Sequence, residues 1–182
     1  MATGGPLLDW TRFIFELIDM RSFSNLWYWI ALAVTWSTAS HWVLGVPFDM
    51  VLRARRQGGE AERDLEDMVR VNVTRLLQLT QTGGLFVLAF VCFALTVLGM
   101  LGFWYKVEFC QAVFLLVFPL SIVGILSLMT ARRIVARGEG GEVLRRQMAT
   151  HRVWVQIVGM LSIFVTAFWG MLQNFNLSVL GN

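Results

Sequence analysis

Four long apolar runs dominate the pattern of the chain, and each has about the length that crosses a membrane. They cover residues 26–46, 84–105, 107–129 and 153–173. A helix needs about 20 predominantly apolar residues to cross a hydrocarbon core of about 30 Å. Tryptophan and tyrosine lie near the ends of the runs, as they do at membrane–water interfaces. The pattern predicts an all-α membrane protein, a four-helix transmembrane bundle made of two helical hairpins.

Residues 1–25 have a different pattern, in which charged residues recur every three or four positions among apolar ones. One charged stripe consists of Asp9, Arg12, Glu16 and Asp19. This spacing predicts an amphipathic helix with too many charges to span a bilayer. We expect it to lie in the membrane interface, beside the bundle formed by residues 26–182.

Composition and charge support a membrane protein and set its orientation. Of 182 residues, 57% are hydrophobic and 15% are charged, and the mean hydropathy is +0.63. Of the 15 basic residues, 12 lie between runs one and two or between runs three and four. Because positively charged loops stay in the cytoplasm, both termini are expected outside it. Arginine greatly outnumbers lysine, which indicates a high-GC genome and therefore a bacterial source. We expect the protein to lie in the bacterial inner membrane.

The two basic segments resemble each other. Residues 54–60 and 136–142 share Ala, Arg, Gly, Gly and Glu at matching positions. Each glycine pair follows an arginine-rich helix end and precedes an acidic helix start, a charge order that complements the helix dipoles. Glycine is expected to supply a left-handed turn there. An old duplication and shared turn chemistry both explain the similarity.

A helical pattern continues outside the membrane, between Glu60 and Thr82, so the second span is expected to extend into the cytoplasm. Its apolar stripe needs cover from the chain itself, from the membrane surface or from another protein. Pairs at i,i+4 are expected between Glu66 and Arg70 and between Arg63 and Asp67. Our first hypothesis is a non-enzymatic interaction, assembly or accessory subunit that docks a partner through these helical hairpins. The candidate partner-binding residues are Leu65, Met68, Val69, Leu76, Arg63 and Arg70.

Catalytic chemistry is sparse. No serine or threonine in the runs has a neighbouring base that would activate it, and the loop 137–142 lacks the Gly-Lys-Ser/Thr ending of a phosphate loop. We therefore expect no enzyme. The basic clusters are explained by the orientation of the protein in the membrane, so they do not require a site for lipid headgroups. No nucleic acid partner is expected. No run carries a charge near its middle, which disfavours ion-coupled transport.

Two alternatives remain. The small and polar residues 35–41 are expected to lie inside the bundle, and a passive channel or transporter subunit could use them in a homo-oligomer. His41 and His151 lie near the same membrane face and could clamp a haem b iron in an electron-transfer subunit. Otherwise no cofactor and no metal site are expected.

Residues 19–29 (DMRSFSNLWYW) and 40–47 (SHWVLGVP) resemble a family of small inner-membrane proteins from alphaproteobacteria of the Rhodobacter group. The resemblance covers nearly the whole chain. Members are often described as components of the Suf iron–sulfur cluster assembly complex, which implies iron–sulfur assembly proteins as partners. Cys92 and Cys110 lie at membrane depth and cannot hold a cluster. The resemblance therefore implies docking rather than chemistry done by this chain.

Overall fold

The computed structural model describes residues 26–138 and 140–180, without the side chains of residues 174 and 176–180. The fold is helical, as predicted, with one small hairpin of strands. The elements are α2 (Leu26–His41), β1 (Trp42–Val43), β2 (Val46–Pro47), α3 (Phe48–Gln57), α4 (Gly59–Gly99), the π-helix η2 (Met100–Trp104), α5 (Glu108–Arg137) and α6 (Gly141–Leu180). The amphipathic helix predicted for residues 1–25 lies outside the described residues.

Among the described residues, three helices are long and apolar enough to cross a membrane: α4 with η2, α5, and α6. They match the predicted runs 84–105, 107–129 and 153–173, except that residues 105 and 107 lie in the turn between η2 and α5. The first predicted run, 26–46, is corrected, because α2 ends at His41 and the chain then turns into the β hairpin. With 16 residues, α2 is about 24 Å long at 1.5 Å per residue. Its described length is therefore short of the ~30 Å of a hydrocarbon core.

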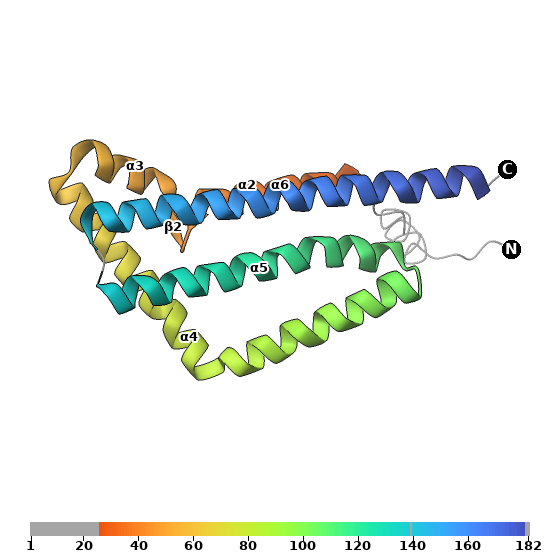
Figure 1. Ribbon diagram of the computed structural model, residues 1–182, viewed down its shortest axis with the longest axis horizontal. Coiled ribbons are helices and arrows are strands. Elements are labelled where there is room, and N and C mark those ends of the chain that lie inside the picture. The colour runs from red at the N-terminus through yellow and green to blue at the C-terminus, as the bar shows by residue number, and fades with distance from the viewer. Residues whose placement is uncertain (1–25, 139, 181–182) are drawn as a thin grey trace, which may run out of the picture.

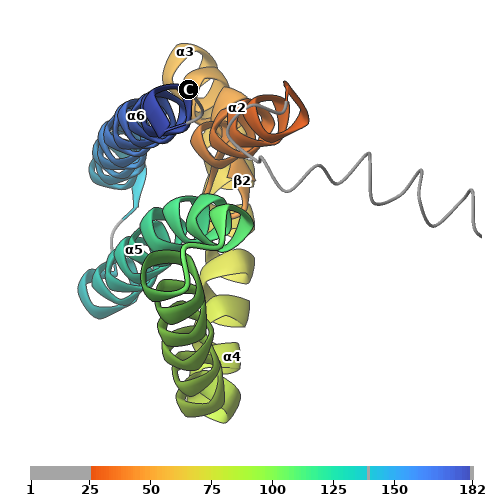
Figure 2. The ribbon, with the colours of Figure 1, turned by 90° about the vertical axis from the view of Figure 1, so that its right-hand side faces the viewer.

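The helices form layers rather than a closed bundle (Figures 1 and 2). Figure 2 shows α2 and α6 side by side, with α5 below them and α4 below α5. In Figure 1, α2 and α6 run in opposite directions, and α5 returns between α6 and α4. The end with α3 is called the basic end here, and the end with η2 is called the turn end.

Helix α4 bends midway, where its yellow-green first part meets its green second part (Figure 1). The hydroxyl of Thr80 donates to the carbonyls of Leu76 (2.6 Å) and Leu77 (3.2 Å), and Gly83 and Gly84 follow. Threonine hydroxyls that bond back to the preceding turn bend helices, and adjacent small residues allow the bend. The predicted extension through Thr82 is confirmed as helix, and it leads away from the direction of the span.

The second part of α4 exposes apolar side chains on every side. Leu85, Phe86 and Phe90 are 78%, 80% and 70% exposed, and the most apolar window of this helix has no buried residue. Water-soluble proteins rarely leave such a continuous apolar surface uncovered. Lipid chains are the natural cover for it.

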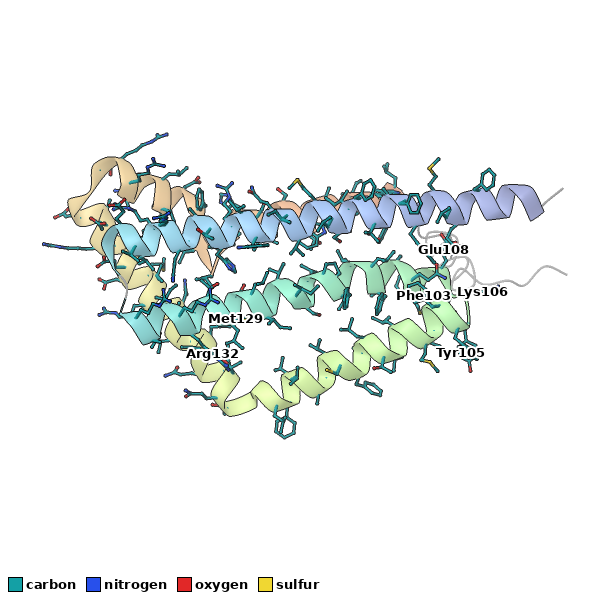
Figure 3. The ribbon with its side chains drawn as sticks, viewed as in Figure 1. Phe103, Tyr105, Lys106, Glu108, Met129 and Arg132 are labelled. Carbon is teal, nitrogen blue, oxygen red and sulfur yellow. The ribbon has the colours of Figure 1, made fainter. Side chains whose placement is uncertain are left out.

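The chain reverses tightly at the turn end, as the sequence predicts. Tyr105 follows η2, Lys106 adopts a φ of 57°, and α5 begins at Glu108. Figure 3 shows Phe103, Tyr105, Lys106 and Glu108 together at this end, opposite Met129 and Arg132. The π-helix brings Gly102 against α5, where a Cβ atom would lie 3.0 Å from the nitrogen of Gln111.

A compact head lies at the basic end and contains the main apolar core. We define the head as residues 42–82, 131–138 and 140–150, which comprise the hairpin, α3, the first part of α4, the end of α5 and the start of α6. The fully buried members of this core include Val43, Val46, Ala54, Leu65, Val69, Val73, Ala131, Leu144 and Met148. The sequence predicted the helices of the head but not their joint core.

Glycine makes both turns of the head, as predicted. Gly58 and Gly59 have φ values of 61° and 54° between α3 and α4. Gly138 and Gly141 have φ values of 57° and 59° between α5 and α6. Only glycine adopts this conformation without steric cost.

Candidate functional site

The six candidate partner-binding residues do not share one surface. Leu65 and Val69 are each 1% exposed in the core of the head, and Leu76 packs against that core. The chain itself therefore covers these three side chains, and we correct them from partner contacts to core residues. Their stripe is apolar because it faces α3, α5 and α6. Of the three possible covers named above, the chain itself is therefore the one observed.

The other three candidates lie on the surface. Met68 is 42% exposed, and Arg63 and Arg70 are exposed. Two residues that the sequence pattern did not single out, Val71 and Leu79, are 45% and 71% exposed. In a helix with 3.6 residues per turn, Met68, Val71 and Leu79 fall within roughly 80° of arc. We call these three residues the outer strip of α4.

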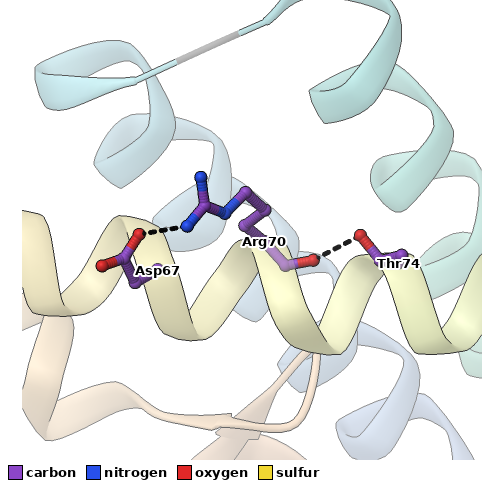
Figure 4. Close-up of polar contacts among 3 residues, drawn as sticks. All are labelled: Asp67, Arg70 and Thr74. Carbon is purple, nitrogen blue, oxygen red and sulfur yellow. Dashed lines mark hydrogen bonds and ion pairs between the residues drawn. The ribbon is translucent and has the colours of Figure 1, made fainter.

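Ion pairs on α4 differ from the predicted ones. Arg70 donates to Asp67 at 2.8 Å, a spacing of i,i+3, and the hydroxyl of Thr74 donates to the carbonyl of Arg70 at 2.7 Å (Figure 4). The side chains of Arg70 and Asp67 are 76% and 68% exposed. A pair this exposed contributes about 0.2–1 kcal/mol.

Glu66 has a different partner from the predicted Arg70, and Glu62 binds near it. Glu66 accepts a hydrogen bond of 2.6 Å from the backbone N–H of Gly141, at the start of α6. Glu62 pairs with Arg145 on the first turns of α6. Carboxylates are favourable next to a helix N-terminus because its N–H groups carry partial positive charge. The start of α4 thus holds the start of α6 and closes the head.

His151 is buried and faces α5. It is 5% exposed, its Nδ1 lies 3.1 Å from the hydroxyl of Thr130, and its Nε2 lies 3.3 Å from that of Ser127. Each hydroxyl also lies within donating distance of a carbonyl one turn back, those of Leu126 and Val123. A neutral imidazole has one donor and one acceptor nitrogen, so one hydroxyl must donate to the ring instead of to its carbonyl.

His41 lies apart from this cluster. It is exposed at the end of α2, and its ring stands edge-to-face with Trp42, with 6.2 Å between the centroids. Haem ligation needs two imidazole nitrogens aimed at one iron. In the structure both nitrogens of His151 are engaged on α5, and His41 projects from another helix.

The polar residues of α2 lie only partly in the interior, where Thr35 and Ser40 are half-buried. Ser37 and Thr38 are exposed, which corrects their expected position inside the bundle. The contact with α6 is made by Leu32 and Trp36, which are 2% and 5% exposed. Gly159 accommodates the indole, since a Cβ atom there would lie 2.7 Å from Cε3 of Trp36.

A buried glutamine at the turn end was missed by the sequence analysis. Gln111 is 3% exposed and donates to the carbonyl of Gly102 at 2.7 Å. Its Oε1 accepts from Nε1 of Trp169 (2.9 Å) and from Nε2 of Gln173 (3.1 Å). An amide inside an apolar run needs partners in a membrane, so this position was the available signal.

The described part of the chain holds no group of three or more His, Cys, Asp or Glu side chains suited to a metal ion. Comparison with family models, curated proteins and solved structures finds no match for the chain. The head, its outer strip and the three apolar helices are the features of the described chain that bear on its function.

Proposed function

We propose that this chain is a multi-pass protein of the bacterial inner membrane, and that it acts as a non-enzymatic assembly or accessory subunit. Its head lies in the cytoplasm, α2 completes a fourth crossing, and both termini lie outside. The basic residues support this orientation, since 12 of 15 fall in or next to the head segments.

One observation carries the docking role: the head buries its own core and still exposes an apolar strip. Leu65, Val69 and Val73 complete the core from one side of α4, while Met68, Val71 and Leu79 stay exposed on the neighbouring side. Exposed apolar residues at helical spacing are the usual anchors of helix-mediated recognition. We propose a cytoplasmic protein as the occupant of this strip, and the resemblance to Suf-associated proteins suggests an iron–sulfur assembly protein.

The test replaces the outer strip with glutamate in the full-length protein. The tagged variant M68E/V71E/L79E is purified from native membranes beside the wild type, and each co-purifying protein is quantified by mass spectrometry. Loss of a binding hot spot costs about 2 kcal/mol or more, so we expect a roughly thirtyfold loss of the specific partner. The control L52E/V135E changes exposed apolar residues of the head outside the strip and should keep the partner.

Two results would contradict the proposal. One is a partner that stays bound to the strip variant or leaves the control equally. The other is a spin label at Val71 that is shielded by lipid in the absence of any partner, because the membrane surface would then cover the strip. Equal membrane insertion and equal helix content of all variants exclude misfolding as the cause of a loss.

A further inference from the structure

A cavity of about 460 Å³ lies between α5 and α6 where the apolar spans give way to the head. Arg133 and Arg137 line it from α5, and Arg146 and Thr150 line it from α6. Leu126, Met129 and Trp154 line its membrane side. Its volume is within the range of small-molecule sites, about 300–1,000 Å³.

The electrostatics of the cavity favour an anion. Three arginines line it, and none of the described residues that line it is an aspartate or a glutamate. Two other arginines of the head have acidic partners: Arg145 pairs with Glu62, and Arg70 pairs with Asp67. Within the described residues, the guanidinium groups of Arg133 and Arg146 form no ion pair with the protein. Guanidinium groups bind phosphate oxygens in a two-pronged geometry, so this pair is suited to a phosphate.

The cavity also has an apolar side, which would orient a bound ligand. Trp154 and Met129 are 53% and 46% exposed, and they lie toward the spans. Figure 3 shows Met129 and Arg132 on the part of α5 that lies near the basic end, where many side chains carry nitrogen atoms. Arginines on one side and exposed apolar side chains on the other match a molecule with an anionic head and hydrocarbon tails.

We infer that this cavity binds the phosphodiester headgroup of an anionic glycerophospholipid from the head-side leaflet. Arg133 and Arg146 hold the phosphate, and the acyl chains lie along Leu126, Met129 and Trp154. Basic pockets between membrane helices on the cytoplasmic side are known to bind anionic headgroups. The sequence explained these arginines by orientation alone; the cavity and the unpaired guanidinium groups of Arg133 and Arg146 give these two residues a ligand. The inference needs the membrane location proposed above but no protein partner.

The test measures the lipid retained by the purified full-length protein. The protein is reconstituted in bilayers of phosphatidylethanolamine and phosphatidylglycerol at 9:1, transferred to mild detergent and weighed by native mass spectrometry. We expect phosphatidylglycerol to be retained far above its share of the mixture. Because each arginine supplies charge-assisted hydrogen bonds, R133Q/R146Q should lower that retention by about tenfold or more.

Controls separate the site from total charge and from free phosphate. R56Q/R63Q removes two exposed arginines of the head that do not line the cavity and should retain the lipid as the wild type does. R133K/R146K keeps the charge and should recover part of the retention. Glycerol 3-phosphate at millimolar concentration should not displace the lipid, because it lacks the acyl chains.

Three outcomes would overturn the inference. Phosphatidylethanolamine retained equally well would show that the cavity does not select an anion. Equal loss in R56Q/R63Q would show a general charge effect. Displacement by glycerol 3-phosphate would show a free-phosphate site instead of a lipid site. Since Arg133 and Arg146 are exposed, the fold of R133Q/R146Q should persist, and circular dichroism verifies this.

Discussion

The hydroxyl of Ser162 on α6 donates to the backbone carbonyl of Leu115 on α5, at 3.4 Å. Residue 119, four positions after Leu115, is a proline inside α5. Proline has no N–H, so the carbonyl of Leu115 lacks its helical donor. Ser162 supplies the missing donor from the neighbouring helix and thereby joins α5 to α6 at membrane depth.

Substitution of Ser162 by alanine should destabilise the packing of α5 on α6. The variant leaves the carbonyl of Leu115 without a donor in a region where water is scarce, and we expect a loss of about 1 kcal/mol. Unfolding in mixed detergent and SDS micelles, followed by far-ultraviolet circular dichroism, measures it. The control S37A alters an exposed serine of α2 and should leave the unfolding curve unchanged.

A double-mutant cycle tests whether Pro119 is the reason for this bond. In P119A, the new N–H at position 119 can donate to the carbonyl of Leu115, so Ser162 is no longer needed. The effect of S162A should then fall to within about 0.5 kcal/mol of zero. An undiminished effect of S162A in the P119A background would show that Ser162 acts through another contact.

The contact of Gly159 with Trp36 predicts a second sensitive position. A Cβ atom at 159 would lie 2.7 Å from Cε3 of Trp36, so G159A must displace the indole and loosen α2 from α6. Overpacking of this kind costs about 1–3 kcal/mol, measurable as a lower unfolding midpoint. At Gly124, no atom lies within 4 Å of an added Cβ. G124A should therefore be neutral or slightly stabilising, and an equal loss there would contradict the packing argument.

Hydropathy located the three long helices because lipid and apolar side chains impose a simple requirement of length and polarity. The same signal failed at residues 42–46, which were predicted to be the end of the first span. Trp42, Val43 and Val46 are apolar, yet they form a hairpin whose register pairs Val43 with Val46. An apolar residue has the same hydropathy whether it is buried in the core of the head or faces lipid.

The sequence contains only one of the two residues that usually indicate such a hairpin turn, the glycine. Leu44 and Gly45 have φ values of 53° and 76°, the pair of positive angles that a tight two-residue turn requires. Asparagine or aspartate before glycine is the usual signal, and leucine is not. Leu44 is 9% exposed in the core of the head, and the amide of Asn72 on α4 donates to the carbonyl of Gly45 at 3.0 Å. Tertiary contacts therefore hold a turn that local preference would not form.

The candidate site shows the same limit. The periodicity of α4 correctly marked Leu65 and Val69 as residues that need cover, but periodicity does not say which surface covers them. Their cover comes from α3, α5 and α6, which are brought together by contacts distant in sequence. Those contacts, such as Glu62 with Arg145, leave no local pattern to read.

Glu62 and Glu66, which hold the start of α6, should contribute more to the free energy of unfolding than the exposed ion pair of Asp67 with Arg70. E62A and E66A each remove a carboxylate that contacts the start of α6, and a lost charge-assisted bond costs about 1.5–3 kcal/mol. The control D67A removes the exposed pair with Arg70 and should cost about 0.5 kcal/mol or less. Hydrogen exchange of the amides at the start of α6 should rise in E66A and stay unchanged in D67A. Equal exchange in the two variants would show that Glu66 does not hold α6.

Gln111 should be the most sensitive polar residue of the turn end. In Q111L, the carbonyl of Gly102 and the indole N–H of Trp169 lose the partners that they have in the structure. Unsatisfied buried groups cost about 1–3 kcal/mol, and we expect a loss of about 2 kcal/mol in the free energy of unfolding.

Two matched variants give this expectation its control. W169F removes one of the three bonds and keeps an aromatic ring against Phe103, so its effect should be less than half as large. Q156L makes the same chemical change as Q111L at an exposed position of α6 and should not destabilise the protein. If Q156L were as harmful as Q111L, the cost would come from changing any glutamine in these helices. If Q111L were harmless, the three bonds at the turn end would add nothing to stability, and η2 would be held against α5 by packing contacts such as that of Phe103 with Phe114.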